Sequence, residues 1–125
     1  MSAKGQMDEV FLKKINDVIE THIDDEGFGV REMCREIGVS RSKLHRKLKS
    51  LTRKSASQFI REYRLERALE MLISGDATAA EIAYNVGFRS PSYFSSSFHN
   101  YFGYTPSEAH LYDSNSFDSE EVDGS

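Results

Sequence analysis

A short stretch of the chain concentrates positive charge in a form suited to binding phosphates. Residues 38–55, GVSRSKLHRKLKSLTRKS, contain seven Lys or Arg and no Asp or Glu. Residues 31–67 hold twelve Lys or Arg against four Glu, a balance of +8, although the formal net charge of the chain is −4. Most charged runs are solvated helix faces, but a block this polarised is typical of proteins that bind a polyanion. An acidic protein partner could use the same surface.

The residue patterns give little support for catalysis or for metal binding. The segment GFGVRE lacks the third glycine of a phosphate-binding loop and follows no predicted strand. The serines near His99 have no Gly-x-Ser-x-Gly turn. His45 has no second His or Cys at the spacing of metal ligands, and His22 lies on an apolar stripe typical of a packed histidine. We therefore predict a protein that is not an enzyme and needs no cofactor.

Composition predicts a cytoplasmic protein with one domain or two very small ones. At 125 residues the chain can bury a modest core. Its single cysteine, Cys34, cannot form a disulfide within the chain, as is typical of reducing compartments. No stretch resembles a secretion signal or a membrane span, so we expect no membrane contact by this segment.

Helical spacing of apolar residues predicts an all-α fold with about seven helices. We expect a flexible N-terminal segment at 1–7, a first unit at about 8–54, a linker helix at about 56–73, a second unit at about 77–112, and a disordered acidic tail at 113–125. The linker helix is apolar on more than one side, which is typical of a helix buried between two packed units.

Two segments repeat the pattern of a helix-turn-helix, in which a second helix crosses the first after a sharp turn. Cys34 stands four residues before Gly38, and Ala83 stands four before Gly87, so that small residues let the helices approach. In the helix that follows each glycine, apolar residues are expected to face the core. These are Leu44 and Leu48 in the first unit and Tyr93, Phe94, Phe98 and Phe102 in the second. Two such matches, joined by a helix that is apolar on more than one side, specifically indicate a pair of helix-turn-helix units.

The segment from Ile82 to Pro106, IAYNVGFRSPSYFSSSFHNYFGYTP, resembles the signature of the AraC/XylS transcription regulators. SRSKLHRKLKSL and RLERALEML match the first recognition helix and the linker helix of that family, so the likeness covers about 8–112. FLKKINDVIE followed by GVSRSKLHRKLKSLT is most similar to the C-terminal domain of hybrid two-component regulators.

The resemblance implies two helix-turn-helix subdomains whose recognition helices enter adjacent major grooves of double-stranded DNA. A linker of about eighteen residues measures roughly 27 Å, close to the ~34 Å of one DNA turn. It also implies that the chain works with other domains of a larger regulator and with the transcription machinery. The base-reading positions of the family map onto Ser42, His45 and Arg46. In the second unit, Ser92, Ser95 and Ser96 point outward when Phe94 and Phe98 face inward, and they are the candidate base-reading residues there, with anchoring to the DNA backbone as the alternative.

Arg46 is the strongest candidate reader, because a guanidinium can bind guanine O6 and N7 together. The predicted phosphate contacts are Ser40, Arg41, Lys43, Lys47, Lys49, Arg53, Lys54, Arg89, Ser90 and His99. Arg53 stands where many family members have glycine, and Ser96 and His99 stand where many have Arg and Lys. We therefore expect the first unit to provide most of the affinity and specificity, with the second acting mainly as an anchor. The alternative is a protein-interaction module that docks its basic face on an acidic partner.

Overall fold

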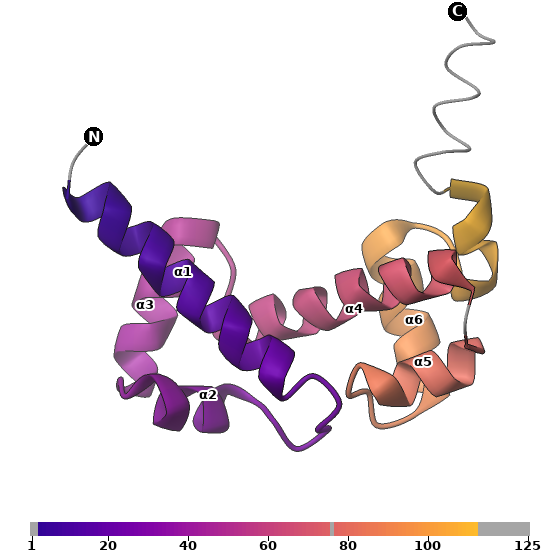
Figure 1. Cartoon of the computed structure of the whole chain (residues 1–125), viewed down its shortest axis with the longest axis horizontal. Coiled ribbons are helices and arrows are strands. Elements are labelled where there is room, and N and C mark those ends of the chain that lie inside the picture. Colours follow the sequence, from indigo (N-terminus) through magenta and orange to yellow (C-terminus); the bar gives the residue numbers. More distant parts are fainter. Residues whose placement is uncertain (1–2, 76, 113–125) are drawn as a thin grey trace, which may run out of the picture. The chain divides into compact units, whose positions relative to one another are not determined.

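The computed structural model describes residues 3–75 and 77–112, and in these ranges the chain is all-helical, as predicted (Figure 1). Six α-helices are followed by a short 3₁₀ helix, η1, and no strand occurs among the described residues. The helices are α1 (Ala3–Thr21), α2 (Val30–Ile37), α3 (Arg41–Thr52), α4 (Ala56–Ser74), α5 (Ala79–Asn85), α6 (Pro91–Phe102) and η1 (Pro106–Tyr112). None of the described helices is both long and apolar enough to cross a bilayer.

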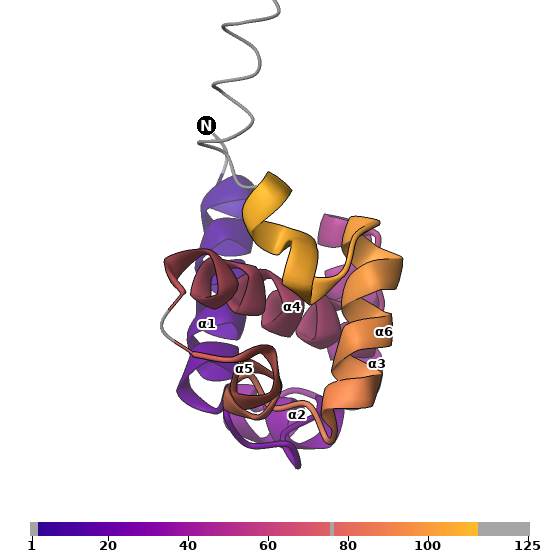
Figure 2. The same cartoon turned by 90° about the vertical axis from the view of Figure 1, so that its right-hand side faces the viewer.

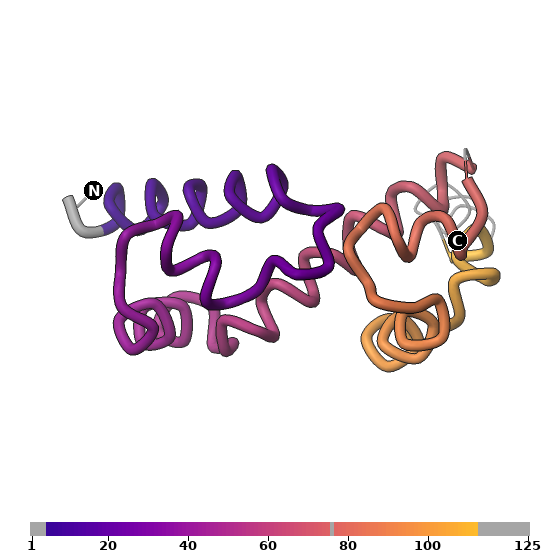
Figure 3. Tube along the Cα trace, turned by 90° about the horizontal axis from the view of Figure 1, so that it is seen from below, coloured from indigo at the N-terminus to yellow at the C-terminus, as the bar shows by residue number. Residues whose placement is uncertain are grey.

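The chain divides into two compact units, and the boundary lies inside α4, between Arg64 and Leu65. The helix expected as a separate linker thus contributes its first half to unit 1 and its second half to unit 2. α1 begins at Ala3 and runs as one unbroken coil (Figure 3), so residues 3–7, expected as a flexible segment, are helical. Ala, Lys, Gln and Met in this segment are good helix formers. The expected disordered tail at 113–125 lies outside the described residues.

The core of unit 1 gathers one apolar face from each of its helices. Ile15 and Ile19 of α1, Met33 of α2, and Leu44 and Leu48 of α3 are fully buried. Their i, i+4 spacing in α1 and α3 puts each pair on one side of its helix, which confirms the predicted inward positions in α3. The three helices therefore fix one another through a single shared cluster.

The turn between α2 and α3 follows the predicted helix-turn-helix chemistry. Gly38 ends α2 with φ +81°, a left-handed conformation that costs glycine little, and its N–H donates to the carbonyl of Cys34 at 2.8 Å. Ser40 then caps α3, and its Oγ accepts a hydrogen bond from the Lys43 N–H at 3.1 Å. Both the helix stop at Gly38 and the N-cap at Ser40 can be predicted from the sequence.

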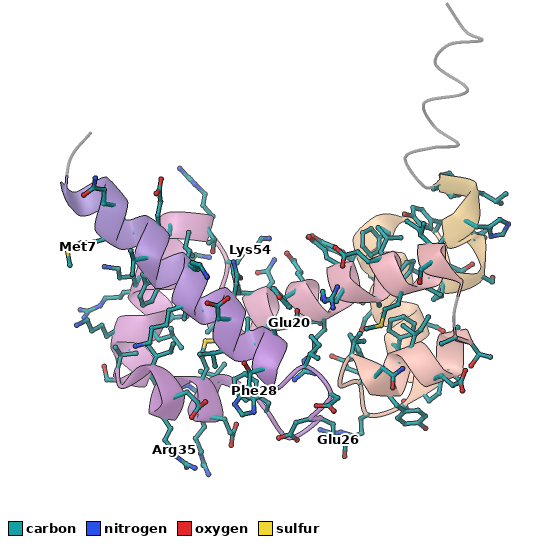
Figure 4. All side chains as sticks on the ribbon, viewed as in Figure 1. Met7, Glu20, Glu26, Phe28, Arg35 and Lys54 are labelled. Atoms are coloured by element: carbon teal, nitrogen blue, oxygen red, sulfur yellow. The ribbon has the colours of Figure 1, made fainter. Side chains whose placement is uncertain are left out.

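Arg64 is the buried charged residue of unit 1, and only 5% of its surface is exposed. Its guanidinium donates to the carbonyls of Ile23 at 2.6 Å, Asp25 at 3.1 Å and Phe28 at 3.0 Å. Burial lowers the pKa of Arg64, and the carboxylates of Asp25 and Asp24 oppose that shift. The residue therefore holds the loop between α1 and α2 against α4 (Phe28 and Glu26 mark this loop in Figure 4).

Unit 2 is built around aromatic rings. Phe94 and Phe98 of α6 are fully buried, with ring centroids 5.7 Å apart, and Ile82 of α5 packs in the same unit at 0% exposure. Figure 2 shows α6 in full, with η1 turning back from its end. Tyr93, expected to face the core, is instead 52% exposed, because it lies only one residue before Phe94 and therefore about 100° around the helix.

Capping signals delimit the helices of unit 2. Thr78 and Glu81 form the predicted capping box of α5, with the Thr78 N–H donating to Glu81 Oε1 at 2.9 Å and the Glu81 N–H donating to Thr78 Oγ1 at 3.1 Å. This hydrogen bonding lowers the pKa of Glu81. Pro106 begins the 3₁₀ helix η1, in which Glu108 accepts a hydrogen bond from the Thr105 N–H at 2.9 Å.

Candidate nucleic-acid interface

α3 presents an exposed, acid-free ridge opposite its buried leucines. Ser42, Arg46 and Lys49 lie at i, i+4 and i+7 on this ridge, and all three are exposed. Within the described ranges, none of the three side chains has a hydrogen bond or an ion pair. Buried leucines on one side and unpartnered cations on the other make α3 a helix whose outer face is free to meet a ligand.

The other exposed residues of this surface border the ridge on both sides. At 100° per residue, Arg41 and His45 lie on one flank of α3, and Lys43 and Ser50 lie on the other. Ser40, which caps α3, is also exposed. The structure therefore brings the predicted base-reading and phosphate-binding residues of α3 onto one continuous surface of unit 1.

Two lysines among the predicted phosphate contacts form ion pairs within unit 1. Lys47 is half-buried, with its Nζ 3.8 Å from Asp8 Oδ1 and 5.3 Å from the centre of the Phe11 ring. Lys54, labelled in Figure 4, has its Nζ 2.7 Å from Glu62 Oε1. Lys47 links α3 to α1, and Lys54 links the turn after α3 to α4, so each would have to leave its partner to reach a phosphate.

The Lys54 partner is a carboxylate whose environment favours its charged form. Burial alone would raise the pKa of Glu62, but hydrogen bonds from Lys54 and Gln58 lower it overall. The Gln58 Nε2 donates to Glu62 Oε2 at 2.9 Å. Gln58 therefore does not complete a capping box with Ser55, although Ser55 Oγ accepts a hydrogen bond from the Gln58 N–H at 3.2 Å.

The Asp8 carboxylate opposes any phosphate that approaches this flank of α3, so replacing it with Asn is expected to tighten duplex binding about two- to fivefold at low salt. The Asp8→Asn change removes one negative charge and releases Lys47 from its ion pair. Stability should fall by less than about 1 kcal/mol, because the pair is partly exposed. Fluorescence anisotropy at two salt concentrations measures the effect.

Asp17→Asn is the matched control, because Asp17 is an exposed carboxylate on the same helix that pairs with Lys13 at 3.0 Å. Equal affinities of the Asp8 and Asp17 variants would contradict a specific effect of Asp8. A gain that persists unchanged at high salt would also contradict it, since the effect is electrostatic.

Arg53 ends α3 in an unusual backbone conformation for its residue type. Its φ is +66°, and among the described residues no other residue besides glycine has a positive φ. The Arg53 N–H donates to the Lys49 carbonyl at 2.9 Å. A left-handed conformation costs an L-residue roughly 1–2 kcal/mol relative to glycine. The side chain is exposed and adds a positive charge at the C-terminal end of α3, at a position where glycine would relieve the backbone strain.

Arg53→Gly is therefore expected to change stability and binding in opposite directions. The free energy of unfolding should rise by about 0.5–1 kcal/mol as the strain is relieved. Duplex affinity should fall several-fold, and the slope of log K against log salt should decrease in magnitude by about one. Urea denaturation and anisotropy titrations measure the two effects separately, and Arg53→Ala, which loses the charge but keeps the strain, should weaken binding without stabilising the fold.

In unit 2 the corresponding surface is polar but nearly uncharged. Ser92, Ser95, Ser96 and His99 are exposed opposite the buried Phe94 and Phe98, as predicted. Ser96 Oγ donates to the Tyr93 carbonyl at 3.2 Å, which leaves its oxygen only as an acceptor. Arg89 is exposed just before α6, and Ser90 caps the helix by accepting from the Tyr93 N–H at 3.2 Å.

Two exposed residues of α6, Tyr93 and Asn100, were not among the predicted site residues. Aligning Phe94 with Leu44 places Tyr93 at the position of Lys43 and Asn100 at that of Ser50, on the same flank of their helices. The sequence alone gives this register, but it also predicts Tyr93 to face the core, which leaves Tyr93 and Asn100 out of the predicted site. Neither residue carries a charge, so the outer face of α6 offers hydroxyl, amide and aromatic contacts.

The histidines do not gather into a metal site. No group of three or more His, Cys, Asp or Glu side chains suited to a metal ion occurs among the described residues. His22, predicted to be a packed or helix-end residue, stacks on Phe28 with ring centroids 4.7 Å apart, and its Nε2 lies 3.0 Å from Glu36 Oε1.

Comparisons with known proteins agree with the helix-turn-helix architecture. The chain matches the helix-turn-helix domain family over residues 33–110. It is 40% identical over 104 residues to histidine kinase P4 of Formosa agariphila, an alignment that covers 83% of this chain and 8% of that protein. It spans 27% to 32% of the length of four further curated relatives, of which three are named as HTH-type transcriptional regulators or activators and one as an operon regulatory protein.

Solved structures show the same fold over most of the chain. A transcriptional regulator of Chromobacterium violaceum, described as an AraC-type DNA-binding domain-containing protein, is 29% identical with a TM-score of 0.75, covering 88% of this chain and 95% of that one. The DNA-binding domain of AdpA, solved with a target DNA, is 25% identical with a TM-score of 0.71, covering 80% and 88%. The paired units and a family match over more than half of its length show that the chain belongs to the AraC-type family of helix-turn-helix domains.

Proposed function

We propose that this chain binds double-stranded DNA in a sequence-specific manner, as the DNA-binding part of a transcription regulator. The observation that carries the proposal is the outer face of α3, where Ser42, Arg46 and Lys49 are exposed, free of internal partners and next to no acidic residue of the same helix. A helix of this size fits the major groove of B-DNA. The resemblance to the AdpA domain solved with its target DNA supports the same conclusion.

Within α3 we assign base reading to Ser42, His45 and Arg46. Arg46 can hold guanine O6 and N7 through two hydrogen bonds, and Ser42 and His45 lie within one turn of it. Arg41, Lys43, Lys49 and Arg53 surround these residues and are assigned to phosphates, which position the helix without reading sequence. Lys47 and Lys54 contribute only through long-range charge unless their ion pairs open.

In unit 2 we assign α6 mainly to anchoring. Ser92, Ser95 and Ser96 offer short hydroxyl contacts that discriminate weakly among bases. Arg89, Ser90 and His99 are assigned to the DNA backbone. We propose that α3 and α6 enter adjacent major grooves, because α4, with 19 residues, is about 28 Å long, on the scale of one helical turn of DNA.

We further propose that the chain acts beside other domains of a larger regulator of the two-component type and with the transcription machinery. This view is supported by the match to histidine kinase P4 of Formosa agariphila, since the aligned segment makes up only 8% of that protein. We also propose a cytoplasmic location, which is consistent with a DNA-binding role.

Selection of bound duplexes from a random pool, followed by anisotropy titrations over a range of salt concentrations, tests the proposed function. The expected result is one enriched site and an affinity that falls steeply and log-linearly with salt. Failure to enrich any sequence, or binding that does not respond to salt, would contradict it. Capture of an acidic protein without any shift of duplex DNA would favour the docking alternative.

A further inference from the structure

Unit 1 contains a hollow beside the recognition helix, between α3 and the start of α4. It has a volume of about 420 Å³. Arg41, Ser42 and His45 line it from α3, and Ser55 and Ser57 line it from the beginning of α4. The residues that line it include no Asp or Glu. Val30 and Ala56 add apolar surface, and the other walls offer a guanidinium, an imidazole and three hydroxyls, groups that can hold an oxyanion.

A second hollow on the opposite flank of α3 has a different character. It has a volume of about 320 Å³, and Lys43, Arg46 and Lys47 share its lining with the carboxylate of Asp8. A negative charge thus stands inside this hollow, and Lys47 is already paired with it. Of the two hollows that border the ridge, only the one beside α4 is free of opposing charge.

We infer that the hollow between α3 and α4 holds a phosphate of the DNA backbone, and that Ser57 contacts it. This inference rests on the proposed function, because the phosphate belongs to the DNA strand that borders the major groove entered by α3. When a helix lies in the major groove, a sugar-phosphate strand runs along each flank, and contacts to it fix the register of the helix on the duplex. The volume is large enough for one phosphate group together with several waters, each of which occupies about 30 Å³ in the liquid.

The hydroxyl of Ser57 is placed to donate to such a phosphate. Ser57 is exposed, and its Oγ lies 3.5 Å from that of Ser55. Ser55 Oγ accepts a hydrogen bond from the Gln58 N–H, and its own O–H can donate to Ser57 Oγ, so that the Ser57 hydroxyl is left to donate to the phosphate. Arg41 on the facing wall supplies the positive charge. The residues of α3 read the bases, while the Ser57 contact fixes the position of unit 1 along the phosphate backbone.

Ser57→Asp tests this inference directly. The variant places a carboxylate where the phosphate is expected, and affinity for both the selected site and random duplex should fall about tenfold at 100 mM salt, with a smaller loss at higher salt. The selected sequence should not change, because Ser57 reads no base. Asp in the first turn of a helix is favourable, so the variant should keep its fold. Ser57→Ala should weaken binding two- to threefold.

Ser74→Asp is the matched control, since it makes the same change at an exposed serine at the opposite end of α4. Its affinity should stay within about twofold of the unaltered chain. Replacing single phosphates of the selected duplex with neutral methylphosphonates should then reveal one position at which the unaltered chain and the Ser57→Asp variant bind alike.

The outcomes separate this inference from the proposed function. If the unaltered chain binds no duplex, the proposed function itself fails. If the unaltered chain binds a selected duplex and the Ser57→Asp variant binds it equally well, only the inference that this hollow holds a backbone phosphate is overturned. Tight binding of inorganic phosphate by the chain alone, with duplex affinity unaffected by Ser57→Asp, would show a free-anion site and would also overturn it.

Discussion

Arg46→Ala is expected to reduce affinity for the selected duplex by about 10- to 100-fold, the equivalent of losing one bidentate contact to guanine. Affinity for random duplex should fall much less, because only one charge is lost from a surface that carries several. The side chain is exposed and has no partner among the described residues, so its removal should leave the fold and its stability unchanged. The loss therefore reports recognition alone.

Lys49→Ala is the matched comparison, because Lys49 is an exposed cation on the same ridge, three residues further along α3. It should weaken binding to every duplex by a similar factor and reduce the magnitude of the salt slope by about one. Anisotropy titrations of both variants against the selected and a scrambled duplex measure the ratio of specific to non-specific affinity. An Arg46 variant that keeps the original ratio would remove Arg46 from the base-reading residues.

Local signals explain why the fold could be predicted in detail. Gly38, Ser40 and the Thr78–Glu81 pair act through backbone groups within four residues of themselves, so their roles can be deduced from spacing alone. The buried positions Leu44 and Phe94 were similarly fixed by helical periodicity. The free outer face of α3 follows from these inward positions, which is why Ser42, Arg46 and Lys49 were placed correctly on the surface.

Long-range pairings explain what the sequence did not reveal. Lys47 and Asp8 are 39 residues apart, and nothing in the composition of α3 distinguishes Lys47 from Lys49 until α1 packs beside it. The hollow beside Ser57 likewise exists only because the start of α4 lies against α3. Tyr93 was misplaced for a local reason, since a run of aromatic residues hides which one faces inward.

Arg64 is the residue that periodicity was least able to explain, because a charged side chain in the middle of α4 would ordinarily be assigned to the surface. Its guanidinium donates to three carbonyls 36 to 41 residues earlier in the chain, all of them in the loop between α1 and α2. A loop of this kind leaves carbonyl groups without partners in a helix or sheet. One buried guanidinium satisfies three of them and fixes the entry to α2.

Arg64→Met is accordingly expected to lower the free energy of unfolding by about 3 kcal/mol or more, because it removes the donor of three carbonyls that are buried or partly buried. Arg64→Lys keeps the charge but loses the planar fork of donors, and should be intermediate. Arg61→Met, at an exposed position one turn earlier in α4, is the control and should change stability by less than about 0.5 kcal/mol. Urea denaturation followed by circular dichroism gives the three values.

A loss of that size is a large fraction of the 5–15 kcal/mol by which small domains are usually stable. Because the affected loop leads into α2, whose Met33 packs against α3, the Arg64→Met variant should also weaken duplex binding at temperatures where it is partly unfolded. Binding measured well below its melting temperature should approach that of the unaltered chain, since Arg64 is not part of the ridge. Equal stability of the Arg64→Met and Arg61→Met variants would instead show that water satisfies the three carbonyls as well as the guanidinium does.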